Sequence, residues 1–261
     1  MIDVQNMGDT RGIAIQRVGI SKAWLPFLVA AGRKKPQNVT AMVDRFTVDL
    51  PMEYKGTHMS RFMEILHEYA NKPLDFNAVD GLLNETLGKL SAKSAHIAIS
   101  FKYFIKKAAP VSKKESLLDI NCTFIGDKTE NKPLDFTMSV AVPITSLCPC
   151  SKEISEYGAH NQRSMVQAAV KICSENDVTI EKLAAIIEKQ ASSPIFPVLK
   201  REDEKYVTEA AYENPKFVED ILRDLVLALR KLDGINYFSI ECENFESIHN
   251  HNAYASHQEY K

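Results

Sequence analysis

The most reactive side chains of this chain, two cysteines and a histidine, lie in one short polar segment. Cys148 and Cys150 lie two positions apart in the stretch TSLCPCSKEISEYGAHNQRS (145–164), and His160 follows ten residues later. Gly158 stands just before the histidine and permits a sharp turn. A disulfide, a metal site, a nucleophile and chance are the four explanations to weigh.

The spacing of the cysteines argues against the simplest structural roles. Two thiols at i and i+2 are too close for an unstrained disulfide, and structural zinc sites usually take Cys-x-x-Cys. Five cysteines at irregular spacing also make a disulfide framework unexpected. Burial as small apolar residues fits poorly with the Pro, Ser, Lys and Glu neighbours. We therefore expect one cysteine to serve as a ligand or nucleophile, and with His160 and a third ligand it could form a catalytic metal site with an open position.

An acidic stretch near residue 200 offers one further candidate. In KREDEKYVTE, Glu202 directly follows Lys200 and Arg201. A solvated helix start is the ordinary interpretation of so many charges. The mixture of charges also suits a phosphate site beside a metal ligand.

The stretch ENFESIHNHNAYA (243–255) is the second concentration of polar chemistry. His249 and His251 project to one side if the segment is extended, and Glu243 and Glu246 stand just ahead. Two histidines with neighbouring asparagines can provide oriented acid–base groups. A polar C-terminal tail is the competing interpretation.

Composition places the chain among ordinary globular proteins. It has 261 residues, 45% of them hydrophobic and 25% charged, with a formal net charge of −2. That charge argues against a general nucleic-acid binder, which would carry a basic surplus. No apolar run reaches the roughly 20 residues that span a bilayer, and the N-terminus does not resemble a signal peptide. We therefore expect a cytoplasmic protein with reduced thiols and no membrane partner.

Hydrophobic periodicity predicts the elements that position these residues. Residues 1–36 are expected to form an irregular arm ending in the basic turn GRKKP. Strands are expected at 38–51, 94–108, 115–127, 134–145 and 235–246. Four helices are expected: one that begins after an N-cap at Ser60, and three over 77–91, 179–192 and 214–232. Thr179 is expected to cap the third helix, and Pro215 to lie in the first turn of the fourth. Residues 163–173 fit either a strand or a helix. Strands grouped apart from helices predict an α+β fold with a mainly antiparallel sheet.

Five stretches together resemble the type IB GTP cyclohydrolases: DTRGIAIQRVGI, GTHMSRF, TSLCPCSKEISEYGAHNQRS, KREDEKYVTE and ENFESIHNHNAYA, between residues 9 and 255. The resemblance implies the α+β tunnelling fold, with two modules of antiparallel sheet, each with helices on one face. We place the modules at 37–145 and 146–261, and most active-site residues in the second. The resemblance also implies a homotetramer. It implies that GTP is converted to 7,8-dihydroneopterin triphosphate and formate, the first step of tetrahydrofolate biosynthesis.

The same resemblance assigns roles to individual residues. Cys148 is similar to the metal-binding cysteine of the family, with His160 and Glu202 as its partners. One divalent ion is implied, and this donor set suits Zn²⁺ while letting Mn²⁺ or Fe²⁺ compete. Glu243 or Glu246 would anchor the purine, with Glu243 preferred, and His249 or His251 would supply protons. The candidates for binding the triphosphate are Lys152, Arg163, Lys200 and Arg201. Cys150 has no settled role.

Two other functions remain open from the sequence. One is another tunnelling-fold enzyme, of the nitrile reductase type, in which Cys148 or Cys150 acts as nucleophile without a metal. The other is a binding or assembly module whose Cys–His site merely holds zinc.

Overall fold

Long strands provide the frame of this chain, and three of them have 15 residues each: β1 (Ile15–Val29), β4 (Ser94–Ala108) and β5 (Glu115–Thr129). The computed structural model describes residues 5, 7–30, 36–173 and 178–261, so most of the expected GRKKP turn lies outside the described residues. Contacts divide the chain into two units. The first comprises Met1–Lys102 and Thr123–Met138, and the second comprises Tyr103–Cys122 and Ser139–Lys261.

The first unit combines a sheet with two helices. Its strands are hydrogen-bonded in the order β6-β5-β4-β2-β1-β3. The β1–β2 and β2–β4 pairs are antiparallel, and the short β1–β3 pair is parallel. The bounds are β1 Ile15–Val29, β2 Gln37–Leu50, α1 Met59–Ala70, β3 Pro73–Leu74, α2 Phe76–Leu90, β4 Ser94–Ala108, β5 Glu115–Thr129 and β6 Asp135–Leu147, the last three shared with the second unit.

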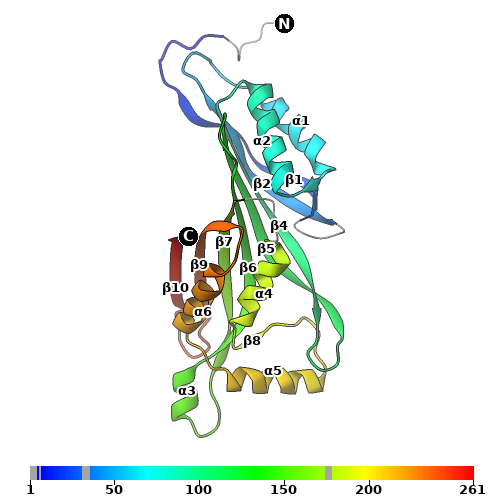
Figure 1. Cartoon of the computed structure of the whole chain (residues 1–261), viewed down its shortest axis with the longest axis vertical. Coiled ribbons are helices and arrows are strands. Elements are labelled where there is room, and N and C mark those ends of the chain that lie inside the picture. The colour runs from blue at the N-terminus through cyan, green and yellow to red at the C-terminus, as the bar shows by residue number, and fades with distance from the viewer. Residues whose placement is uncertain (1–4, 6, 31–35, 174–177) are drawn as a thin grey trace. The chain divides into compact units, whose positions relative to one another are not determined.

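Helices α1 and α2 lie side by side and pack on the sheet of the first unit (Figure 1). Phe62 of α1 meets Phe46 of β2 edge to face, with ring centroids 5.0 Å apart. Gly126 of β5 allows α2 to approach closely, because a Cβ atom there would stand 2.8 Å from Val79 Cγ1. Each helix thus buries one apolar face against the sheet, with Phe62, Ile65 and Leu66 buried on α1 and Val79, Leu82 and Leu83 buried on α2.

The second unit carries the remaining elements. Its strand order is β10-β9-β7-β6-β5-β4, with the short β8 paired to β6. Antiparallel pairing joins β7 to β9 and β9 to β10. The bounds are α3 Pro149–Ile154, β7 Asn161–Ile172, α4 Ile180–Lys189, β8 Ser193–Pro194, α5 Arg201–Glu213, α6 Val218–Arg230, β9 Ile235–Asn244 and β10 Ala253–Tyr260.

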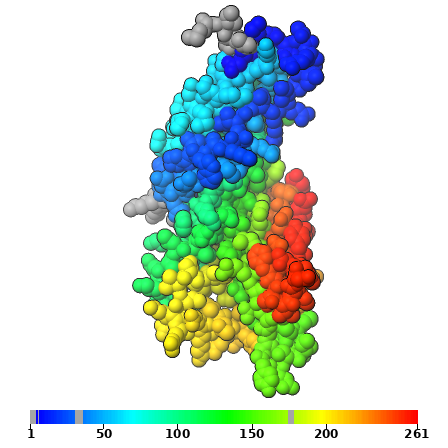
Figure 2. Space-filling view, turned by 180° about the vertical axis from the view of Figure 1, so that it is seen from behind, coloured from blue at the N-terminus to red at the C-terminus, as the bar shows by residue number. Residues whose placement is uncertain are grey.

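The core of the second unit lies between its sheet and the helices α4 and α6 (Figure 1). Helix α6 buries residues three or four positions apart, including Ile221, Leu225 and Leu229, which gives it one apolar face. Helix α4 begins where the Thr179 hydroxyl accepts a hydrogen bond from the Lys182 N–H at 3.0 Å. Strand β10 ends the strand order and lies at the surface (Figure 2).

Most of the predicted elements are confirmed, one open alternative is decided, and three details are corrected. The 163–173 stretch is a strand, β7. Residues 15–29 form strand β1 rather than an irregular arm, because they pair with β2 along its length. Helix α1 has His58 rather than Ser60 at its N-cap position, and Pro215 precedes α6, whose N-cap is Phe217.

Strand β10 and the short helix α3 were not predicted from the sequence. No helix among the described residues has the length and apolarity needed to cross a bilayer. The division into two tunnelling-fold modules at 37–145 and 146–261 stays a prediction.

Candidate active site

Cys148 stands at the junction between β6 and α3. It is the N-cap residue of α3, and Pro149 occupies the first helical position, where a missing N–H costs nothing. The Ser151 N–H lies 3.5 Å from Cys148 Sγ, and the Lys152 N–H donates to the Cys148 carbonyl at 3.2 Å. The half-buried thiol is thus held at the end of a core strand.

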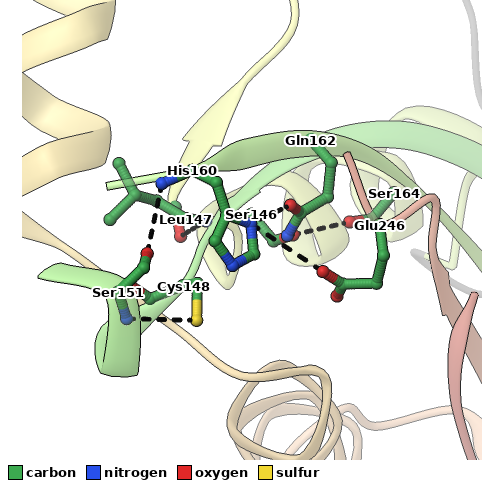
Figure 3. Close-up of polar contacts among 9 residues, drawn as sticks. Ser146, Leu147, Cys148, Ser151, His160, Gln162, Ser164 and Glu246 are labelled. Carbon is green, nitrogen blue, oxygen red and sulfur yellow. Dashed lines mark hydrogen bonds and ion pairs between the residues drawn. The ribbon is translucent and has the colours of Figure 1, made fainter. Parts of the chain in front are cut away.

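His160 returns to Cys148 through a loop closed by three hydrogen bonds. Gly158 has φ +135°, a conformation that residues with a Cβ rarely adopt. The Cys148 N–H donates to the His160 carbonyl at 3.1 Å. The Ser151 hydroxyl accepts from the His160 N–H and donates to the Cys148 carbonyl, both at 3.1 Å. Figure 3 shows the Cys148 sulfur and the His160 ring facing the same space.

Glu246 brings a carboxylate to the same histidine. Its Oε2 lies 3.8 Å from His160 Nδ1, and the side chains of His160 and Glu246 are only 14% and 13% exposed. The antiparallel register pairs Ser164 with Asn244, which sets residue 246 opposite residue 162, two positions beyond His160. Sequence reasoning assigned Glu246 only to the purine and missed this neighbour, because the contact follows from the β7–β9 register, which the motifs do not reveal.

Helix α5 positions the charged residues around Glu202. Glu202, Lys200 and Arg201 are exposed at the first turn of α5. The next residue, Asp203, is fully buried and accepts hydrogen bonds from the Lys200 N–H, the Ser112 N–H and hydroxyl, and the Val111 N–H.

Asp203 was not singled out in the sequence, although its bonds fix the start of α5. Burial alone would raise the pKa of Asp203, but the hydrogen bonds from Ser112, Lys200 and Val111 together lower it well below its usual value. The carboxylate therefore stays charged and anchors the start of α5 to the turn between β4 and β5.

The turn between β9 and β10 gathers the other predicted residues. The rings of His249 and His251 stack with centroids 5.1 Å apart, and both side chains are exposed. Glu243 Oε1 accepts a hydrogen bond from Asn252 Nδ2 at 2.8 Å. The structure therefore joins the two histidines as a pair and ties Glu243 to the same turn.

The remaining candidates have differing surroundings. Lys152 Nζ donates to the Tyr212 carbonyl and lies 4.3 Å from the centroid of the Tyr212 ring, so this cation already holds α3 to α5. Arg163 is exposed on β7. Cys150 is an exposed free thiol on α3, and all five cysteines are free.

Donor types at Cys148 and His160 fit a divalent cation, since thiolate and imidazole are common zinc ligands. Within the described ranges, no three His, Cys, Asp or Glu side chains lie close enough together to hold a metal ion. The structure thus brings Cys148 and His160 together without adding Glu202 to them. Glu202 as the third ligand stays a prediction.

A cavity of about 450 Å³ lies beside this segment. Its wall includes Leu147 and Ala159, the sequence neighbours of Cys148 and His160, together with Phe196, Thr208 and Tyr212. The volume is in the range of small-molecule sites.

The sequence matches a known family along nearly its whole length. The sequence model of a family described as type I GTP cyclohydrolase folE2 matches residues 1–255. The chain belongs to the type I GTP cyclohydrolase FolE2 family. GTP cyclohydrolase FolE2 of Geobacter sulfurreducens is 50% identical over 256 residues, which cover 98% of this chain and 97% of that relative. GTP cyclohydrolase FolE2 of Nitrosomonas eutropha is 49% identical over 253 residues, covering 97% of this chain and 93% of the relative.

Solved structures share the fold of this FolE2 family member at low sequence identity. Uricase from Arthrobacter globiformis superimposes with a TM-score of 0.53 at 7% identity, covering 94% of this chain and 93% of that chain. Urate oxidase from Bacillus subtilis 168 gives a TM-score of 0.53 at 8% identity, covering 94% and 99%. These likenesses concern the fold alone. They confirm the expected α+β tunnelling-fold class.

Proposed function

We propose that this chain is a GTP cyclohydrolase. It hydrolyses the imidazole ring of the guanine in GTP to give 7,8-dihydroneopterin triphosphate and formate, the first step of tetrahydrofolate biosynthesis. The observation that carries the proposal is family membership over residues 1–255. Relatives named GTP cyclohydrolase FolE2 are 49% and 50% identical in sequence to this chain. The motifs that carry the resemblance include the Cys148–His160 segment.

The reaction depends on one divalent cation, Zn²⁺ with Mn²⁺ or Fe²⁺ as competitors, held by Cys148, His160 and Glu202. Cys148 and His160 supply sulfur and nitrogen donors on a loop already closed by backbone hydrogen bonds. When bound, such a cation makes water a competent nucleophile near neutral pH, which attack on C8 of guanine requires. Glu202 lies on a helix whose start is fixed by Asp203.

Other residues bind the substrate and move protons. Glu243 accepts hydrogen bonds from the N1–H and 2-amino group of guanine, with Glu246 as the alternative anchor. His249 or His251 delivers protons during ring opening, because the pKa of histidine lies near the working pH. Lys152, Arg163, Lys200 and Arg201 are the cations for the triphosphate. Of these, Lys152 is supported least, since Tyr212 already engages it.

The proposal extends to assembly and location. The chain forms a homotetramer in the cytoplasm, with active sites at subunit interfaces, and belongs to the wider tunnelling-fold superfamily through the modules 37–145 and 146–261. Strand β10 supports an assembly of this kind, because among the described residues it ends the strand order and pairs with β9 alone.

Formate release from GTP tests the proposed function. Purified protein is treated with a strong chelator, reloaded with Zn²⁺, Mn²⁺ or Fe²⁺, and incubated with GTP while formate and a pterin fluorophore are measured. We expect release only after reloading. Activity that survives complete metal removal would favour a cysteine nucleophile of the nitrile reductase type, and bound zinc without any formate would favour a binding module.

A further inference from the structure

A chain of buried polar side chains leads from the core of the second unit to His160 (Figure 3). Ser146 and Ser164 are fully buried, and Gln162 is 7% exposed. Gln162 Oε1 lies 3.0 Å from His160 Nδ1, Gln162 Nε2 donates to Ser146 Oγ at 2.7 Å, and Ser164 Oγ donates to Ser146 Oγ at 3.0 Å. Polar groups at such depth are costly unless each is bonded, so these bonds restrain the Gln162 side chain, with its amide nitrogen toward Ser146 and its amide oxygen toward His160.

The orientation of Gln162 determines which ring nitrogen of His160 carries the proton. In a neutral imidazole one nitrogen donates and the other accepts, and the partner of one sets the role of the other. Nδ1 faces the amide oxygen of Gln162 at 3.0 Å and the carboxylate of Glu246 at 3.8 Å. Both partners are acceptors, so the proton belongs on Nδ1. The lone pair is left on Nε2.

We propose that Gln162 is a positioning residue that keeps the proton of His160 on Nδ1 and thereby presents Nε2, beside Cys148 Sγ, as the nitrogen that binds a cation. The proposal deepens the proposed function and rests on its metal site. A ligating histidine commonly donates its other N–H to a fixed acceptor, which orients the ring and raises its affinity for the metal.

Gln162 rather than Glu246 carries this role because of distance and restraint. Only the Gln162 contact is within hydrogen-bond length. The Gln162 amide also donates a hydrogen bond to Ser146 Oγ, which restrains it. The Glu246 carboxylate lies 0.8 Å farther from His160 Nδ1 than the Gln162 oxygen does (3.8 against 3.0 Å). If Gln162 had a purely structural role, it would only fill space and bond to Ser146. Its replacement would then leave the tautomer of His160 unchanged.

The tautomer is measurable on metal-free protein, independently of any activity. Ring ¹⁵N shifts of His160 are recorded by long-range ¹H–¹⁵N correlation at a pH where the imidazole is neutral. The variants are Gln162→Met, which keeps the volume and removes the acceptor, and Gln162→Glu, which keeps an acceptor. Gln167→Met is the matched control, because Gln167 is exposed on the same strand.

We expect the Nδ1–H form in the natural chain, in Gln167→Met and in Gln162→Glu, and a shift toward the Nε2–H form in Gln162→Met. Zinc affinity, from competition with a coloured chelator, should fall about 10- to 100-fold in Gln162→Met only. An Nε2–H form in the natural chain, or an unchanged tautomer in Gln162→Met, would overturn the proposal. If Gln162→Met does not fold, loss of the Nδ1–H form in Gln162→Glu would overturn it.

The proposed function can fail separately. A natural chain that shows the Nδ1–H tautomer and binds zinc through His160 but releases no formate from GTP would contradict the cyclohydrolase activity alone.

Discussion

The backbone N–H of Cys148 donates a hydrogen bond to the backbone carbonyl of His160 at 3.1 Å. This bond closes the loop that contains α3, and Ser151 closes it a second time through its hydroxyl. Two side chains separated by twelve positions are thereby brought to one place. The loop can hold them there before any ion is bound, which reduces the ordering that binding requires.

Replacing Cys148 should remove metal binding and turnover together. In Cys148→Ala the sulfur donor is lost, so zinc affinity should fall by more than the ~10–100-fold typical of losing a supporting partner. Metal content after dialysis and formate release from GTP are the two measurements. Cys173→Ala is the control, since Cys173 is an exposed free thiol at the end of β7. A zinc-replete, active Cys148→Ala protein would contradict the assignment.

Replacing a histidine of the pair in the β9–β10 turn should lower the catalytic rate and leave metal binding unchanged. His249→Ala or His251→Ala should retain zinc, and the variant that loses the acid–base group should lose kcat by roughly 10²–10⁴-fold. His67→Ala, an exposed histidine on α1, should change neither quantity. Full activity in both single variants would remove this pair from the proposed proton transfer.

The five thiols should differ in reactivity because their burial differs. Burial raises the pKa of Cys242 to about 12, and burial followed by the charge of Glu181 raises the pKa of Cys122 as well. A higher pKa leaves less thiolate, the reactive form. In metal-free native protein at pH 8, a disulfide reagent should label exposed Cys150 and Cys173 quickly and half-buried Cys148 more slowly. Cys122 and Cys242 should react only after unfolding, and rapid labelling of either would contradict the packing described.

Acid should weaken the attachment of β10 to α6. Arg230 donates to both carboxylate oxygens of Glu259 at 2.9 and 2.8 Å. This guanidinium, with His257 adding to it, lowers the pKa of Glu259 from 4.5 to about 2. Because the folded pKa is the lower one, the ion pair favours the folded state fully above pH 4.5, and the contribution disappears as the pH falls toward 2.

Urea unfolding of Glu259→Gln measures that contribution. The variant should be less stable than the natural chain at pH 7, and the difference should shrink steadily below pH 4.5. Glu241→Gln, an exposed glutamate on β9, should show no such trend. A difference that stays constant between pH 7 and pH 3 would mean that the charge of Glu259 does not stabilise the fold.

The sequence predicted the secondary-structure elements whose signals lie within a few neighbouring residues. Helix α4 begins at Thr179 as expected, since a cap and an apolar periodicity are both encoded within a few residues. Strand β10 was missed because AYASHQEY has no buried residue and alternates only between half-buried and exposed positions. Its strand structure comes from pairing with β9, which a single segment does not reveal.

The site was predicted to the extent that its residues are close in sequence. Cys148 and His160 share one segment, and the structure brings them together. The approach of Glu246 to His160 depends on the register of β7 against β9, and the four bonds to Asp203 come partly from Val111 and Ser112, about ninety positions earlier. Such long-range relations require the tertiary fold, so they could not be read from the motifs.

The turn between β4 and β5 has a practical consequence for anyone modifying this protein. Val111 and Lys113 are exposed there, and hairpin tips of this kind ordinarily accept tags and inserted peptides. Here the N–H groups of Val111 and Ser112 donate hydrogen bonds to Asp203. An insertion would break these bonds and detach the start of α5, with the charged side chains at its first turn. A fusion partner is better grafted at the turn around Asn131, which makes no such attachment to α5 among the described contacts.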